Sequence, residues 1–154
     1  MLAIGFATAA IHAWRDELLL HGIPLRAIGE GPGISDVVKV IACGVTSAGA
    51  ALGRGDASAR SIFVAALFGM VLGALWVRDR GAWQPWAAHT AFRFATGTLL
   101  AGGVVQVRLI DNAWSGGSAG ILAGTAAGVA LAPLAILALV LTVRRMSPRP
   151  AAIG

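Results

Sequence analysis

The last third of the chain contains an apolar run from Ser118 to Val143 that carries no charged residue and ends at Arg144 and Arg145. A helix needs about 20 mostly apolar residues to cross the hydrocarbon core of a bilayer. Charged residues make up only 12% of the whole chain and hydrophobic residues make up 57%, whereas a soluble domain has about 25% charged residues. The sequence therefore predicts an integral membrane protein, and it excludes an ordinary soluble domain and a disordered chain.

Four further apolar segments precede this run, separated by short connections rich in glycine and charged residues. We expect an all-α fold, a multi-pass transmembrane helical bundle of about five membrane segments in a single domain that spans residues 1–154. Pro24 lies late in the first segment and should kink or end its helix. The expected segments are residues 2–28, 34–52, 61–77, 82–107 and 118–143, followed by a basic C-terminal tail at 144–154.

The positive charges favour a lipid bilayer as the main partner and give no support to nucleic-acid binding. The net charge is +5, but the arginines are scattered between the apolar runs, where they set orientation and meet anionic headgroups. With the C-terminus in the cytoplasm, six arginines lie inside and three outside, so we expect this orientation, in a bacterial inner membrane. The inside set is Arg26, Arg78, Arg80, Arg144, Arg145 and Arg149, and the outside set is Arg54, Arg60 and Arg108.

Small residues recur at four-residue spacing on two of the expected helices. Gly69 and Gly73 form one pair, and Gly120, Gly124 and Gly128 form a longer strip. Such spacing lets helix backbones approach closely in lipid. Internal packing of the bundle is one interpretation, and a docking face for another transmembrane protein is the other.

Two groups of ionisable residues lie inside the expected membrane segments, where a charged group is costly. Asp16, Glu17 and His21 form the first group, and His89 and Arg93 form the second. Arg93 needs a carboxylate partner in a medium of low dielectric constant, so we expect the first and fourth segments to be neighbours, with Asp16 or Glu17 within salt-bridge distance of Arg93.

Three interpretations of these groups remain open. They form a buried ion pair that fixes the bundle, they line a hydrolytic cavity, or His89 is a ligand to haem or a chlorophyll-type pigment. The single cysteine, Cys43, excludes a disulfide framework and a zinc knuckle. We expect no metal site and no other cofactor.

Two stretches of the sequence resemble motifs of the CAAX protease and bacteriocin-processing (CPBP, or Abi) family. Residues 16–22, Asp-Glu-Leu-Leu-Leu-His-Gly, resemble the family's EExxxR-G motif. Residues 73–89, which end in Pro-Trp-Ala-Ala-His, resemble the segment that leads into its final HxxxN motif. The similarity extends from about residue 5 to residue 143 and identifies a short member of the family.

The resemblance implies a multi-pass intramembrane endopeptidase in which a glutamate activates water while histidines and an asparagine polarise the scissile carbonyl. Carried onto this chain, the two acids of the first motif fall on Asp16 and Glu17, and its arginine on His21. The histidine of the last motif falls on His89 and its asparagine on Arg93. The family's FxxxH motif belongs around residues 43–50, where this chain has no histidine.

These departures weigh on the expected chemistry. Aspartate in place of glutamate withdraws the carboxylate by about one methylene, and catalysis is sensitive to shifts of roughly 1 Å. The sequence thus favours a catalytically degenerate homologue that serves as an accessory or scaffold subunit of a membrane complex. An active CAAX-type intramembrane glutamic endopeptidase is the alternative, and a haem- or pigment-binding subunit is the third possibility.

Overall fold

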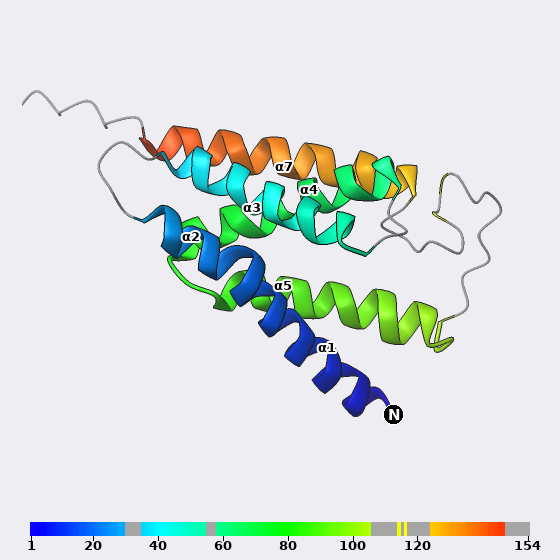
Figure 1. The fold of residues 1–154 in the computed structure, drawn as a ribbon. Helices are drawn as coiled ribbons and strands as arrows, with labels where there is room; N and C mark the ends of the chain where they lie inside the picture. Colours follow the sequence, from blue (N-terminus) through cyan, green and yellow to red (C-terminus); the bar gives the residue numbers. More distant parts are fainter. Residues whose placement is uncertain (30–34, 55–57, 106–113, 115, 117–123, 147–154) are drawn as a thin grey trace, which may run out of the picture.

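The fold is all-α, as the sequence predicts. The computed structural model describes residues 1–29, 35–54, 58–105, 114, 116 and 124–146, and the helices among them are drawn in Figure 1. In chain order they are α1 (Leu2–Glu17), the π-helical turn η1 (Leu18–Gly22), α2 (Ile23–Ile28), α3 (Asp36–Leu52), α4 (Ala59–Asp79), α5 (Trp83–Arg93), the π-helical η2 (Phe94–Ala101) and α7 (Thr125–Met146).

The helical runs coincide with the segments expected from the apolar pattern. Helices α1, η1 and α2 form one run, α5 and η2 form another, and α3, α4 and α7 are single helices. Serine caps start two of them: Ser35 accepts from the backbone N–H of Val38, and Ser58 from that of Ser61. The fourth run ends at Ala101 rather than at residue 107. Gly102 follows directly, and Gly103 takes a φ of 72°. Residues 118–123 of the fifth segment lie outside the described residues.

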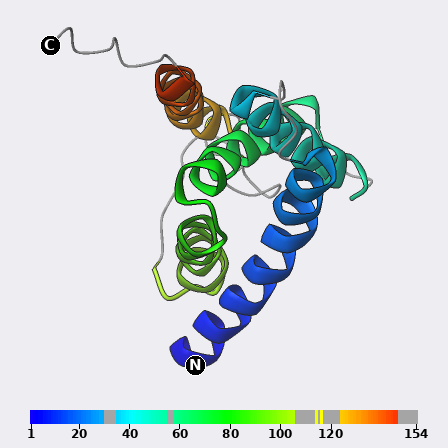
Figure 2. The ribbon, with the colours of Figure 1, turned by 90° about the vertical axis from the view of Figure 1, so that its left-hand side faces the viewer.

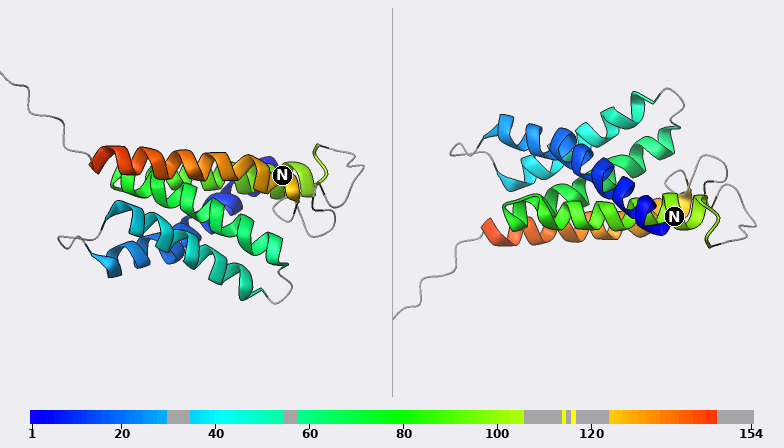
Figure 3. Two further views of the ribbon diagram at one scale, coloured as in Figure 1. Left: turned by 90° about the horizontal axis from the view of Figure 1, so that it is seen from above. Right: turned by 90° about the horizontal axis from the view of Figure 1, so that it is seen from below.

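Helix α4 occupies the middle of the bundle. It packs against α3 on one side and α7 on another, and it also contacts α5 (Figure 2). Helix α1 lies across α5, and η1 reaches α3 and α4. The views from above and below show the same order, with α7 running along α4 (Figure 3). Helix α4 therefore takes part both in the packing with α3 and α5 and in the separate contact with α7.

The pair Gly69 and Gly73 serves internal packing. A Cβ at Gly69 would overlap the hydroxyl of Ser47 in α3, and a Cβ at Gly73 would lie 2.6 Å from the Cβ of Cys43. The absence of side chains at these two positions thus lets α3 and α4 approach closely.

The described part of the second glycine strip also faces the bundle. A Cβ at Gly128 would meet Val64 of α4 at 3.7 Å, and Gly124 is buried. At these positions the strip contributes to the packing of α7 on the bundle, and Gly120 lies outside the described residues. The docking of a second membrane protein on this strip stays a prediction.

Among the described residues, two helices, α4 and the Thr125–Val143 part of α7, are long and apolar enough to cross a membrane. Apolar side chains are exposed along both ends of the chain, as expected of surfaces in contact with lipid tails. They include Ile4, Phe6 and Ile11 on α1 and Val129, Leu134, Ile136 and Leu137 on α7. The number of spans, the orientation and the single-domain organisation stay predictions.

Candidate functional site

Glu17, the last residue of α1, is the centre of a buried polar cluster. Its side chain is fully buried and its carboxylate accepts three N–H groups from three different elements. Oε2 accepts from His21 Nδ1 and from Trp76 Nε1, both at 2.8 Å, and Oε1 accepts from His89 Nδ1 at 2.7 Å. A carboxylate that is removed from water needs such partners, and removing one would leave costly unpaired groups.

Asp16 lies beside Glu17 but engages the other charged groups of the cluster. It forms ion pairs with Arg93 of α5 and, at 2.7 Å, with Arg15. The predicted proximity of α1 and α5, with one of the two acids within salt-bridge distance of Arg93, is confirmed. The contact with Arg93 uses one nitrogen of the guanidinium group, so it is not the two-point fork of a bidentate pair.

His89 uses both ring nitrogens. Arg93 Nε donates to His89 Nε2 at 3.2 Å, and a guanidinium N–H can only donate, so Nε2 is the acceptor. The proton of the neutral ring is therefore on Nδ1, which donates to Glu17. An iron or magnesium ion could bind this imidazole only by displacing Arg93 or Glu17, so the arrangement does not fit the haem or pigment interpretation.

His21 is 1% exposed and makes a different pair of contacts. Its Nδ1 donates to the Glu17 carboxylate, so in the neutral ring Nε2 is the acceptor. The hydroxyl of Ser47 in α3 lies 3.3 Å from that Nε2. The family's FxxxH motif would place a histidine in this part of α3, where this chain has none. The imidazole of His21 approaches this part of α3 from η1 instead.

The local sequence explains how His21 comes to face α3. Pro24 has no N–H and cannot supply the usual helical bond to the carbonyl of Leu20. The hydroxyl of Thr46 donates to that carbonyl instead and ties η1 to α3. The chain takes a π-helical turn over Leu18–Gly22, a feature that is frequent at functional sites. Pro24 does not end the helical run, which continues to Ile28, the last residue of the expected first segment.

A cavity of about 540 Å³ adjoins the cluster. Four of the five residues singled out from the sequence line it, and the fifth, Glu17, lies behind them as their common partner. The polar lining consists of Asp16, His21, Ser47, His89 and Arg93, together with His12, Arg54 and three threonines. The apolar lining includes Phe68, Leu72 and Phe92. The cavity thus combines titratable groups with apolar walls, which is typical of a ligand-binding or active site.

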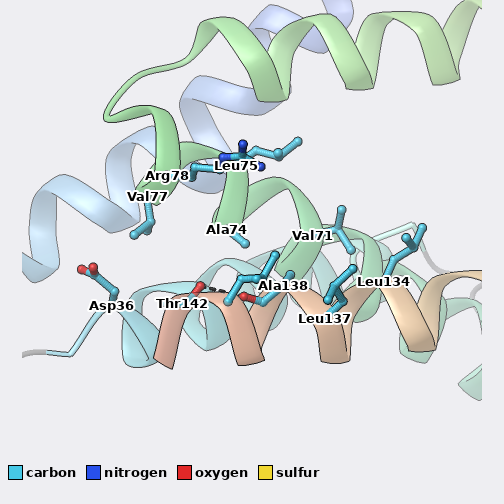
Figure 4. A pocket seen from close by; sticks show the side chains of 11 residues that line it. Asp36, Val71, Ala74, Leu75, Val77, Arg78, Leu134, Leu137, Ala138 and Thr142 are labelled. Atoms are coloured by element: carbon cyan, nitrogen blue, oxygen red, sulfur yellow. Dashed lines mark hydrogen bonds between the residues drawn. The ribbon is translucent and has the colours of Figure 1, made fainter. Parts of the chain in front are cut away.

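A second cavity of about 310 Å³ lies between α4 and α7 (Figure 4). Its lining is mostly aliphatic and includes Val71, Leu75 and Leu137. Thr142 contributes a hydroxyl, but this group donates to the carbonyl of Ala138 in its own helix. Asp36 and Arg78 also line this cavity, but among the described residues no histidine or serine does, and the polar cluster around Glu17 adjoins the first cavity instead.

Sequence reasoning missed two members of the cluster, Trp76 and Ser47. Trp76 lies within the stretch that resembles the family's closing segment, so a signal for it was present. Ser47 had no signal of its own, because a serine in the middle of an apolar helix usually bonds to its own backbone. Within the part of the chain that the structure describes, no group of three or more His, Cys, Asp or Glu side chains is arranged to hold a metal ion.

A model of the family described as type II CAAX prenyl endopeptidase, Rce1-like, matches residues 1–95. This range holds every residue of the polar cluster and ends before α7. No curated protein and no solved structure matches the chain. Because the matched range is more than half of the sequence and contains the whole cluster, the chain belongs to the Rce1-like family of type II CAAX prenyl endopeptidases.

Proposed function

We propose that this chain is an intramembrane peptidase of the CAAX prenyl endopeptidase type, which cleaves a peptide bond near the lipid-modified end of a protein. The observation that carries the proposal is the convergence of Asp16, His21, His89 and Arg93 on one cavity of about 540 Å³. A cluster that served only to fix the bundle would have no need of a cavity with polar walls.

The histidines, rather than the carboxylates, are the groups suited to proton transfer. Glu17 already accepts three N–H groups, so it is a poor base but a firm anchor for two imidazoles. His89 has both nitrogens engaged. His21 has an accepting Nε2 that faces the hydroxyl of Ser47, and it is the general base of this proposal.

The remaining members of the cluster have supporting roles in the proposal. Arg93 lines the cavity with a positive charge that can stabilise the developing negative charge on a carbonyl oxygen. Asp16 holds Arg93 in place through their ion pair. This assignment differs from that of the family, in which a glutamate activates water. In this chain both acids of the matching motif are engaged, because Asp16 is paired with Arg93 and Glu17 accepts three N–H groups.

The test is hydrolysis of a fluorescence-quenched peptide that ends in a farnesylated CAAX sequence, with the full chain reconstituted in lipid vesicles. We expect cleavage by the unchanged protein and a loss of about 10³-fold or more in kcat/KM for His21→Gln and for Glu17→Gln. Asp36→Asn is the matched control, because it removes a carboxylate at the start of α3 that lies outside the cluster. Equal activity of the two cluster variants and the unchanged protein would overturn the proposal.

A non-catalytic accessory role is the second candidate function, and one observation favours it. The ion pair of Asp16 with Arg93 and the three bonds to Glu17 engage both carboxylates of the cluster, as in a purely structural network. Such a role predicts a stoichiometric complex after extraction in mild detergent and no hydrolysis of any peptide. Isolation as a monomer that cleaves the CAAX peptide would exclude it.

A further inference from the structure

A third cavity, of about 1210 Å³, lies at the end of the bundle where α2 ends, α3 begins and α4 ends (Figure 1). Three cations from these three places line it: Arg26 in the last turn of α2, Lys39 in the first turn of α3, and Arg80, which caps α4. We propose that this cavity binds an anionic phospholipid, with the headgroup phosphate against the cations and the acyl chains along the apolar walls. The inference stands apart from the proposed peptidase, because this cavity and the one beside the polar cluster share no lining residue.

The lining carries more positive charge than its own acid can neutralise. Asp36 is the one carboxylate among the described residues that line the cavity, and its Oδ1 lies 3.5 Å from Lys39 Nζ. Within the described ranges, Arg26 and Arg80 form no ion pair, and both side chains are exposed. The cavity therefore presents two guanidinium groups, whose planar fork of N–H donors matches the oxygens of a phosphate group.

The rest of the lining is apolar and matches acyl chains. Leu19 and Ile23 are 52% and 58% exposed, so they have apolar surface left to cover. Trp76 packs close to Gly22, where a Cβ would lie 3.5 Å from the indole ring, and its N–H already donates to Glu17. What Trp76 offers to the cavity is therefore the apolar part of its ring. The other apolar members of the lining are Leu18, Leu25 and Val77.

The size and the place of the cavity favour a phospholipid over a small anion. Sites for small ligands measure about 300–1,000 Å³, so a free phosphate ion would leave most of the 1210 Å³ empty. Basic pockets between transmembrane helices on the cytoplasmic side of a membrane bind anionic headgroups. The orientation expected from the sequence places Arg26 and Arg80 on that side. An anionic phospholipid combines the charge and the apolar length that the lining calls for.

The experiment is a lipid titration of the full chain in detergent micelles, followed by native mass spectrometry. We expect the chain to bind phosphatidylglycerol, and to bind phosphatidylcholine with the same acyl chains about tenfold or more weakly, because the two headgroups differ in net charge. A variant that combines Arg26→Gln with Arg80→Gln should bind phosphatidylglycerol about 25-fold more weakly, at about fivefold for each arginine.

Arg78→Gln is the matched control. Arg78 lies at the same end of α4 as Arg80 and is also exposed, but it lines the cavity beside α7. This variant should leave the dissociation constant for phosphatidylglycerol nearly unchanged. An equal loss in Arg78→Gln and in the double variant would show a diffuse attraction of lipid to the basic end of the bundle, and would overturn the site. Circular dichroism checks that the variants keep their helices, as expected for exposed arginines outside the ion pairs.

Competition with inorganic phosphate separates a lipid site from a site for a free anion. We expect millimolar phosphate to leave phosphatidylglycerol bound, because the acyl chains contribute contacts that phosphate lacks. Displacement of the lipid by phosphate, or equal binding of the two lipids, would overturn the phospholipid as the occupant. Cleavage of the CAAX peptide does not enter this test, so the lipid site and the proposed peptidase stand or fall separately.

Discussion

The two faces of α4 build two different kinds of interior. One face carries Phe68, Leu72 and Trp76 toward the cluster around Glu17, and the other carries Val71 and Leu75 toward α7. The first region is held by directional hydrogen bonds between side chains from distant parts of the chain. The second is held by aliphatic contact, and its one described hydroxyl is satisfied within its own helix.

The difference between the two regions indicates which contacts determine how the helices pack. In lipid no hydrophobic effect drives helices together, so association relies on close packing and on polar contacts. The contacts of α7 with α4 have much the same chemistry as contacts with lipid tails. The polar cluster has no such substitute, because each of its N–H groups needs a particular acceptor. Changes in the cluster should therefore cost more than changes at the α4–α7 contact.

The largest effect is expected from Glu17→Leu. This change leaves the N–H groups of His21, His89 and Trp76 without their common acceptor, and losing one partner of a buried network costs about 3–5 kcal/mol. The measurement is the free energy of unfolding in mixed detergent micelles, followed by circular dichroism. A loss below about 1 kcal/mol would show that the cluster does not stabilise the bundle.

A smaller effect is expected from Gly69→Ala, at the wall of the polar region. The added methyl group would press on the backbone carbonyl of Cys43, and overpacking costs about 1–3 kcal/mol. Gly49→Ala is the matched control, because a Cβ there meets nothing within 4 Å and alanine favours a helix over glycine by about 1 kcal/mol. Unfolding free energies that shift in opposite directions would confirm the close contact of α3 and α4, whereas equal shifts would contradict it.

The smallest effect is expected from Leu137→Ala in the apolar region. Leu137 lines the α4–α7 cavity but is 52% exposed, so lipid or detergent can fill the space that the change leaves. Substitutions at exposed positions usually alter stability by no more than about 0.5 kcal/mol. A loss comparable to that of Glu17→Leu in the same unfolding assay would reverse the contrast between the two regions.

Much of the fold was predictable because the membrane imposes simple requirements. Apolar length located all five helical runs to within a few residues wherever the structure describes them, and the cost of a charge in lipid indicated that Arg93 must meet an acid. The pairing of Arg93 with Asp16 rather than Glu17 was not predictable, since both acids are adjacent in sequence and only the crossing of α1 and α5 separates them. The end of the fourth run at Ala101 was misjudged because hydropathy does not register the break at Gly102 and Gly103.

The sequence alone thus determined an all-helical membrane protein, the family motifs and the few polar residues that lipid would force together. Only the tertiary structure decided which atoms meet. Only the folded chain shows that the hydroxyls of Thr46 and Ser47 reach η1 and that the N–H of Trp76 reaches Glu17. Hydropathy records whether a residue favours lipid, whereas a hydrogen bond depends on the position and direction of two groups that are tens of residues apart in the chain.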